Sequence, residues 1–255
     1  MCVVYIAQGV DPQYPLILLV NRDEFYARPT RALHPWSGGV IAGRDLRGGG
    51  TWMGVDAGGR WGVITNFRAP DQLKSGKRSR GELIPEFLDQ RRSASEFLDA
   101  LRPRMPQYAA FNLLLGDAQG MAYLGSRTDL RHRPTSGLYG LSNAHWDTPW
   151  PKVQRGKALL QTAIEACAPS DALLDLMADT HRPPDHTLPD TGVGLEMEQG
   201  LSSVFVQMPE MAYGTRSTTL LRIDGQGQVE VVERGYDEDG NIVGQQAFCF
   251  EAGVK

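Results

Sequence analysis

The first quarter of the chain alternates short apolar runs with turns rich in glycine and proline. β-Branched and aromatic residues dominate these runs, which is the composition of β-strands. Strands are predicted at 2–8, 16–20, 51–55 and 61–66. Residues 9–15 join the first two strands as a hairpin, and the stretch 29–50 is predicted to be a loop.

Helical spacing of apolar residues begins after Ser79 and predicts a helix there. A second helix is expected from Ser93 to Leu101, because Ser93 and Glu96 form a capping box. Further helices are predicted at 152–167 and 172–177, and a loop at 181–200. Further strands are predicted at 111–115, 121–124, 138–143, 203–207, 217–223, 228–233 and 248–250.

Antiparallel strands interrupted by pairs of helices are typical of α+β domains, in which helices cover the outer faces of stacked sheets. We therefore expect two β-layers between two helical layers, in a single domain spanning residues 1–255. With 41% hydrophobic and 22% charged residues, the composition excludes disordered, collagenous and coiled-coil classes.

The charge balance bears on partners and location. Twenty-six Lys and Arg against 30 Asp and Glu give a net charge of −4, so no nucleic-acid partner is expected. Apolar runs are too short for a transmembrane segment, and the first residues lack the features of a secretory leader. Cys2, Cys167 and Cys249 form no disulfide or metal spacing, which predicts a cytoplasmic protein without a metal site. The oligomeric state is not predicted.

Cys2 is the most informative candidate for chemistry. Removal of Met1, expected before a small residue, would place a thiol and a free α-amine on one residue. An α-amine titrates near ~7.7–8.0, so it can take the thiol proton without a histidine. The alternative is that Cys2 is a small buried hydrophobe at the start of a strand.

The tetrapeptide Asn21-Arg22-Asp23-Glu24 follows the second strand. Pairing of the predicted hairpin brings this strand end beside Cys2. An arginine lowers the pKa of a nearby thiol and clamps a carboxylate or phosphate, and an aspartate holds or orients an amine. A solvated strand end with an ordinary ion pair is the competing interpretation.

Three further polar residues lie at predicted strand ends. Asn66 and Asn143 each end an apolar strand, and an asparagine amide can stabilise an oxyanion. Arg216 begins a late strand together with neighbouring hydroxyl residues. Turn-forming asparagines and a solvent-exposed strand edge are the alternatives.

These segments together resemble the NRDE family, also called the transport and Golgi organisation protein 2 family, over nearly the whole chain. The resemblance rests on Met1-Cys2, residues 21–25 with Arg28-Pro29, 49–54, 65–68, 140–143, 148–152 and 215–219. Members of that family have been linked to haem mobilisation and to acyl-coenzyme A or lipid handling.

The family in turn resembles N-terminal-nucleophile hydrolases with a cysteine nucleophile, such as penicillin V acylase, bile-salt hydrolase and acid ceramidase. This resemblance implies a four-layer αββα sandwich. It implies that Cys2 is the nucleophile, that Arg22 and Asp23 act beside it, and that Asn143 binds the oxyanion. Arg22 and Asp23 are adjacent here, whereas those hydrolases separate the two residues. Since neighbours on a strand point to opposite faces, at most one is expected to reach Cys2.

Two functional hypotheses follow. In the first, the protein is a cysteine hydrolase or acyltransferase that acts on a small non-peptide amide or an acyl thioester and needs no cofactor. Its catalytic residues would be Cys2, Arg22, Asp23 and Asn143, and its substrate-binding residues Asn21, Glu24, Asn66 and Arg216. In the second, a non-catalytic carrier uses the same pocket for haem or for an acyl-coenzyme A or lipid.

Overall fold

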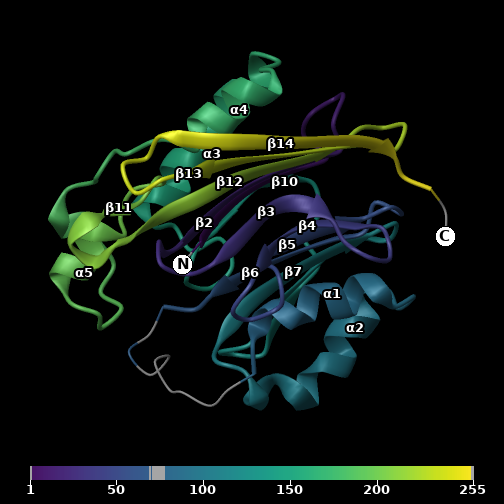
Figure 1. Ribbon diagram of the computed structural model, residues 1–255, viewed down its shortest axis with the longest axis horizontal. Coiled ribbons are helices and arrows are strands. Elements are labelled where there is room, and N and C mark those ends of the chain that lie inside the picture. The colour runs from purple at the N-terminus through teal and green to yellow at the C-terminus, as the bar shows by residue number, and fades with distance from the viewer. Residues whose placement is uncertain (1, 69, 71–77, 254–255) are drawn as a thin grey trace.

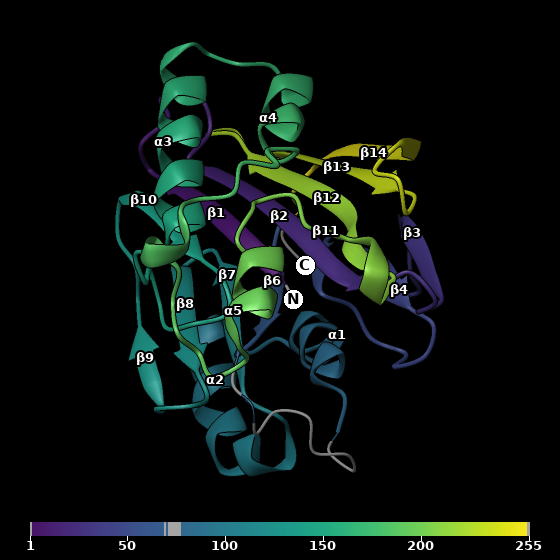
Figure 2. The same cartoon turned by 90° about the vertical axis from the view of Figure 1, so that its left-hand side faces the viewer.

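Two antiparallel sheets stack face to face and carry helices on their outer sides (Figures 1 and 2). The computed structural model describes residues 2–68, 70 and 78–253. In the first sheet the strand order is β10-β1-β2-β12-β13-β14, with β11 also paired to β12. The second sheet runs in sequence order from β3 to β9.

The first sheet consists of β1 (Cys2–Gln8), β2 (Leu16–Phe25), β10 (Gly137–Leu141), β11 (Gln207–Met208), β12 (Tyr213–Ile223), β13 (Gln228–Tyr236) and β14 (Ile242–Glu251). The second consists of β3 (Thr30–Pro35), β4 (Val40–Asp45), β5 (Met53–Asp56), β6 (Trp61–Asn66), β7 (Phe111–Asp117), β8 (Gly120–Gly125) and β9 (Leu130–His132). The α-helices are α1 (Leu83–Asp89), α2 (Ala94–Leu101), α3 (Pro151–Glu165), α4 (Ser170–Leu176) and α5 (Leu195–Gly200). Short 3₁₀ turns are η2 (Arg80–Glu82), η3 (Arg102–Gln107), η4 (Asp185–Thr187) and η5 (Pro209–Met211).

Strand β1 shows why the layers form, because both of its faces are apolar. Val4 and Ile6 pack in the core between the sheets, while Val3 and Tyr5 face α3 and α4 on the other side. A third core lies between the second sheet and the helices α1 and α2. Successive strand residues point to opposite faces, so an uninterrupted apolar run is what a strand covered on both sides requires. The predicted α+β arrangement of two β-layers between helical layers is confirmed.

The stretch 29–50, predicted to be a loop, instead contains the hairpin β3–β4. β3 is largely exposed, and β4 carries an apolar run of only three residues, 40–42, so the pattern of the hairpin resembles that of a loop. Gly38 and Gly39 adopt φ values of +87° and +81° at the turn, which glycine adopts without strain.

Other segments also differ from the prediction, and strand β9 was not predicted at all. Within the predicted loop 181–200 lies α5, a helix too short for an apolar period, whose buried residues are Glu198 and Gly200. Of the predicted strand 203–207, only the last residue belongs to a strand, because the apolar residues there pack as irregular chain. The final strand is longer than expected, since its exposed edge position leaves little apolar signal. β2 continues to Phe25 through buried polar residues.

None of the helices in the described ranges is long and apolar enough to cross a membrane.

Candidate active site

Cys2 opens β1, which lies between β10 and β2 in the first sheet. Directly opposite it in the register is Arg22 of β2, so both side chains lie on the face that looks toward the second sheet. Cys2 is 7% exposed and Arg22 is 4% exposed. The Arg22 guanidinium stacks over the Trp52 ring at 4.4 Å, and its Nη2 lies 4.0 Å from Glu24. Among the described residues its Nη1 has no hydrogen-bond partner.

Asp23 lies on the opposite face of β2, as its position next to Arg22 predicts. Its carboxylate accepts a hydrogen bond of 2.8 Å from Thr215, and its backbone carbonyl accepts one of 2.9 Å from Tyr213. The Asp23 backbone amide is hydrogen-bonded to the Cys2 thiol. Arg22 therefore approaches Cys2 through its side chain and Asp23 through its backbone, while the Asp23 carboxylate sits beside the start of β1.

Burial raises the pKa of the Cys2 thiol, and the negative charge of Asp23 raises it further against the opposing effect of Arg22. The Asp23 carboxyl is also shifted upward by burial, while Lys152 and the bond from Thr215 act against that shift. A thiol with a raised pKa keeps its proton near neutral pH. Cys2 therefore needs an adjacent base before it can act as a nucleophile.

Asn143 joins the two sheets next to Cys2. Its side-chain Nδ2 donates to the backbone carbonyl of Asn66 at 2.8 Å. The backbone carbonyl of Asn143 accepts from the backbone amide of Arg68 at 2.6 Å. The neighbouring Ser142 hydroxyl donates to the Cys2 carbonyl at 3.3 Å. Asn143 is fully buried, and its second amide hydrogen has no acceptor among the described residues. This side chain can thus donate to an oxyanion formed at Cys2.

The other residues predicted to bind substrate hold strands and loops together. Asn21 donates both amide hydrogens to backbone carbonyls, of Met177 and Val204, and accepts from Thr218. This leaves its side chain no hydrogen to offer a ligand. Glu24 lies 3.6 Å from Arg28, which in turn pairs with Asp45 at 2.7 Å.

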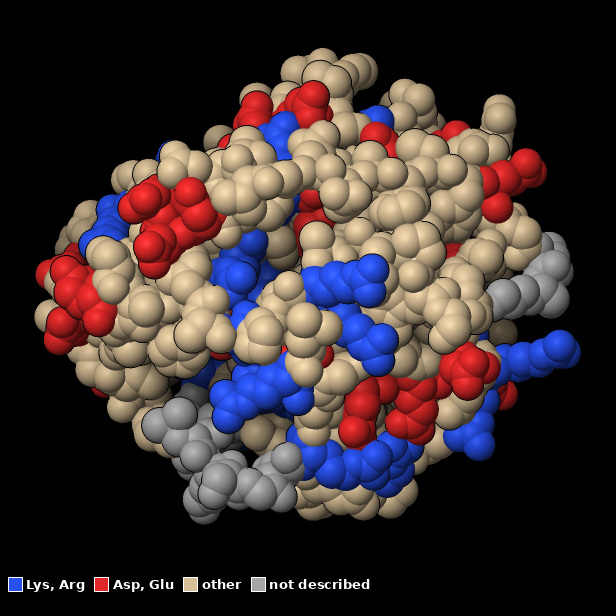
Figure 3. Space-filling model, in the orientation of Figure 1, with Lys and Arg blue, Asp and Glu red and all other residues tan. Residues whose placement is uncertain are grey.

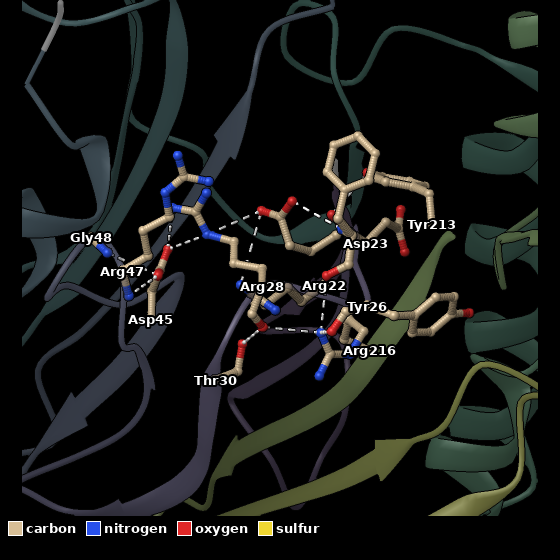
Figure 4. A network of polar contacts seen from close by, with 12 residues as sticks. Arg22, Asp23, Tyr26, Arg28, Thr30, Asp45, Arg47, Gly48, Tyr213 and Arg216 are labelled. Carbon is tan, nitrogen blue, oxygen red and sulfur yellow. Dashed lines mark hydrogen bonds and ion pairs between the residues drawn. The ribbon is translucent and has the colours of Figure 1, made fainter. Parts of the chain in front are cut away.

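Arg216 is the extra residue of a bulge between Thr215 and Ser217 in β12. Its Nη1 donates to three backbone carbonyls of the segment that follows β2, those of Phe25, Tyr26 and Arg28 (Figure 4). The bulge aims Arg216 at this segment. Of the predicted residues, Cys2, Arg22 and Asn143 thus lie together at the end of β1, whereas the Asp23 side chain lies on the opposite face of β2. Asn66 contributes its backbone carbonyl, and Glu24 and Arg216 lie at the edge of this region.

Three buried charges near Cys2 were not predicted from the sequence. Lys152, at the start of α3, donates from Nζ to the Leu201 carbonyl at 2.8 Å. Arg68 pairs with Glu198 at 2.5 Å and stacks over Trp150 at 4.7 Å. Burial, with Arg68 as a second cause, lowers the pKa of Lys152 to about 8. Lys152 and Arg68 lie in two of the blocks that carried the family resemblance, 148–152 and 65–68, but no role was predicted for either residue.

Cationic side chains from several elements act on Cys2, although the chain is acidic overall. Lys152 and Arg80 both interact electrostatically with Cys2 from elements outside β1 and β2. Figure 3 shows Lys and Arg side chains gathered along the middle of the face that it draws. These cations oppose the effect of burial on the pKa of Cys2 without reversing it, and they favour a negatively charged intermediate. In the described residues, no group of three or more His, Cys, Asp or Glu is placed to hold a metal ion.

Comparisons with known proteins confirm the family resemblance. A profile described as Transport and Golgi organisation 2 matches residues 1–238. The chain belongs to the Transport and Golgi organisation 2 family. Its family relatives include the mouse homolog, 33% identical over 256 residues, and the human homolog, 34% identical over 258 residues. Each of these alignments covers 92% of both chains.

Among solved structures, a conjugated bile acid hydrolase from Clostridium perfringens has a TM-score of 0.52 at 10% identity. The alignment covers 100% of this chain and 95% of that enzyme. At this identity the likeness concerns the fold, which is the αββα sandwich of the N-terminal-nucleophile hydrolases. The predicted fold class is thereby confirmed for this member of the Transport and Golgi organisation 2 family.

Proposed function

We propose that the protein is a cysteine N-terminal-nucleophile hydrolase or acyltransferase, which acts on a small non-peptide amide or an acyl thioester. The observation that carries the proposal is the register of β1 on β2, which sets Cys2 opposite Arg22 and the start of β1 beside Asp23. An amine created at Cys2 by removal of Met1 would lie next to that carboxylate. Met1 itself lies outside the described residues.

The reaction would begin with transfer of the thiol proton to the Cys2 α-amine. The sulfur then attacks the carbonyl carbon of the substrate, and Asn143 donates to the resulting oxyanion. Collapse of this intermediate breaks the C–N or C–S bond, and the protonated amine returns its proton to the leaving group. Water, or another acceptor, next attacks the thioester on Cys2 and releases the acyl group. Arg22 and Asp23 hold the thiol and the amine in place.

The raised pKa of the buried Cys2 thiol supports a role for the α-amine as base, because without a base the thiol would stay protonated near neutral pH. The named activity of the bile acid hydrolase belongs to that enzyme. For this chain, the shared fold is the only support for the proposal that the substrate is a conjugated small molecule. We also propose a cytoplasmic location, in keeping with the unpaired cysteines.

The test uses the native protein without its initiator methionine and a panel of acyl amides and acyl thioesters. We expect product release, and an acyl adduct on Cys2 when the reaction is stopped early by acid. Cys2→Ala should abolish product release and the acyl adduct. The matched variant Cys167→Ala should keep product release and the adduct, because Cys167 is exposed and distant in sequence.

Turnover that survives in Cys2→Ala would refute the proposal. Saturable binding of haem or of an acyl-coenzyme A, without any turnover or adduct, would instead favour the carrier hypothesis.

A further inference from the structure

A cavity of about 410 Å³ lies on the other side of the first sheet from the Cys2 thiol, between α3 and the chain from His181 to Val204. Figure 2 shows α3 upright beside the segment that leads to α5. Residues of both elements form its walls, among them Lys152, Arg155, Leu159, His181, Ser202 and Val204.

The walls of this cavity combine cationic and apolar groups. Lys152 and Arg155 carry positive charge, and no Asp or Glu is among the described residues that line it. Arg155 is already paired with Asp179. Leu159, Ala158 and Val204 supply apolar surface on the two sides. The composition fits a ligand with one negatively charged end and a compact apolar body.

Lys152 is the buried cation of this cavity wall whose hydrogen-bonding capacity is only partly used. The residue is 4% exposed, and of the three N–H donors of its ammonium group only one is used, by the Leu201 carbonyl. No ion pair joins it to a carboxylate anywhere in the described ranges. Buried donors are normally satisfied, so two unused N–H groups beside a cavity indicate a place for an acceptor.

We propose that this cavity binds a small organic anion, a carboxylate or a phosphate monoester, whose charged end contacts Lys152 and whose apolar body packs against Leu159 and Val204. Arg155 and His181 add positive and polar groups to the same walls. Burial holds the pKa of Lys152 near 8, and a bound anion would raise it again. The site needs no chemistry at Cys2, so it stands apart from the proposed hydrolase activity.

The site has a route to the candidate active site through Lys152. The Tyr5 hydroxyl of β1 donates to the Lys152 backbone carbonyl at 2.8 Å, and the Lys152 charge acts on both Asp23 and Cys2. An anion bound at Lys152 would weaken the positive field at the amine end of β1. A bound ligand would therefore change the electrostatic environment of Asp23 and Cys2, while its binding would not depend on the proposed hydrolase activity.

The test titrates the full protein with two probes, inorganic phosphate and butyrate, and follows line broadening of each probe by NMR. We expect saturable binding of at least one probe below about 10 mM. Lys152→Met should weaken it at least tenfold. Ala158→Trp, which fills the cavity from an exposed helix position and keeps Lys152, should weaken it similarly.

The matched control is Lys157→Met on the same helix, because the Lys157 ammonium is paired with Asp147 at 2.9 Å and does not line the cavity. Binding should be unchanged in this variant. The proposal is overturned if neither probe saturates, if binding survives Lys152→Met or Ala158→Trp, or if Lys157→Met abolishes it as well. Whether phosphate or butyrate binds more tightly identifies the charged group.

Discussion

Strands β1 and β2 contain an apolar middle and a polar end, and the two regions differ in what they contribute. In the middle, residues such as Val4 and Leu19 fill the cores on both faces of the sheet. At the end, the same strands bury Cys2, Arg22 and Asp23. The pairing continues without interruption from Gln8 opposite Leu16 to Cys2 opposite Arg22. The packing of the apolar middle thus fixes the register of β1 on β2, and this register sets the positions of Cys2, Arg22 and Asp23.

The polar end carries an energetic cost that the middle does not. Burial raises the pKa values of Cys2 and Asp23, and it lowers that of the neighbouring Lys152 in α3. In each case the neutral form of the side chain is favoured. Replacement of such buried polar groups by well-packed apolar residues of similar volume is often neutral or stabilising. The proposed hydrolase activity gives this cost a purpose, whereas the middle contributes to stability alone.

The variant Asn143→Ala should separate the two regions most strongly, because it should affect reactivity far more than stability. We expect acylation of Cys2 by an activated thioester to slow by about 100- to 1,000-fold, because the oxyanion loses a side-chain donor. The free energy of unfolding should fall by only about 1 kcal/mol, for the lost bond to Asn66. Stopped-flow acylation and urea unfolding measure the two quantities. If the loss of acylation rate, converted to a free energy, were no larger than the loss of unfolding free energy, Asn143 would serve the fold alone.

Leu19→Ala should show the reverse behaviour in the apolar middle. Leu19 is fully buried between the first sheet and the helices α3 and α4, so its truncation should cost about 3 kcal/mol of unfolding free energy. The acylation rate of the protein that remains folded should stay within about threefold of the parent. Urea denaturation gives the first value. A Leu19→Ala protein with full stability would contradict the packing described above.

A smaller effect concerns Lys152 and pH. A lysine in the unfolded chain keeps its proton up to its ordinary pKa of 10.5, whereas buried Lys152 releases it near 8. The unfolded state therefore binds more protons between these values, and the free energy of unfolding rises with pH. From pH 7.5 to 9.5 the parent should gain about 2 kcal/mol relative to Lys152→Met. Urea unfolding across this range provides the measurement, and parallel profiles for the two proteins would exclude the shift.

The layered fold was predictable because apolar runs covered on both faces leave a clear signal. The runs that begin at Cys2 and Leu16 gave the central hairpin directly. The hairpin β3–β4 was missed because β3 is largely exposed and β4 has an apolar run of only three residues. The short helix α5 was missed because it buries Glu198 and Gly200 rather than an apolar stripe.

For the candidate site, the pairing of Cys2 with Arg22 followed from hairpin geometry, and the opposite placement of Asp23 followed from strand alternation. Lys152 and Arg68 reach the same place through α3 and the chain after β6, which no local pattern encodes. Their burial depends on how distant segments pack. The sequence likewise gave no reason to expect that Asn21 would use both amide hydrogens within the protein.

If Cys2 acts with its own α-amine, intact-mass spectrometry of the native protein should show it. The expected mass lacks Met1, so that the chain begins at Cys2 with its amine free beside Asp23. A native protein that fully retains Met1 would contradict the account, because the Cys2 nitrogen would then be part of a peptide bond and unable to accept the thiol proton.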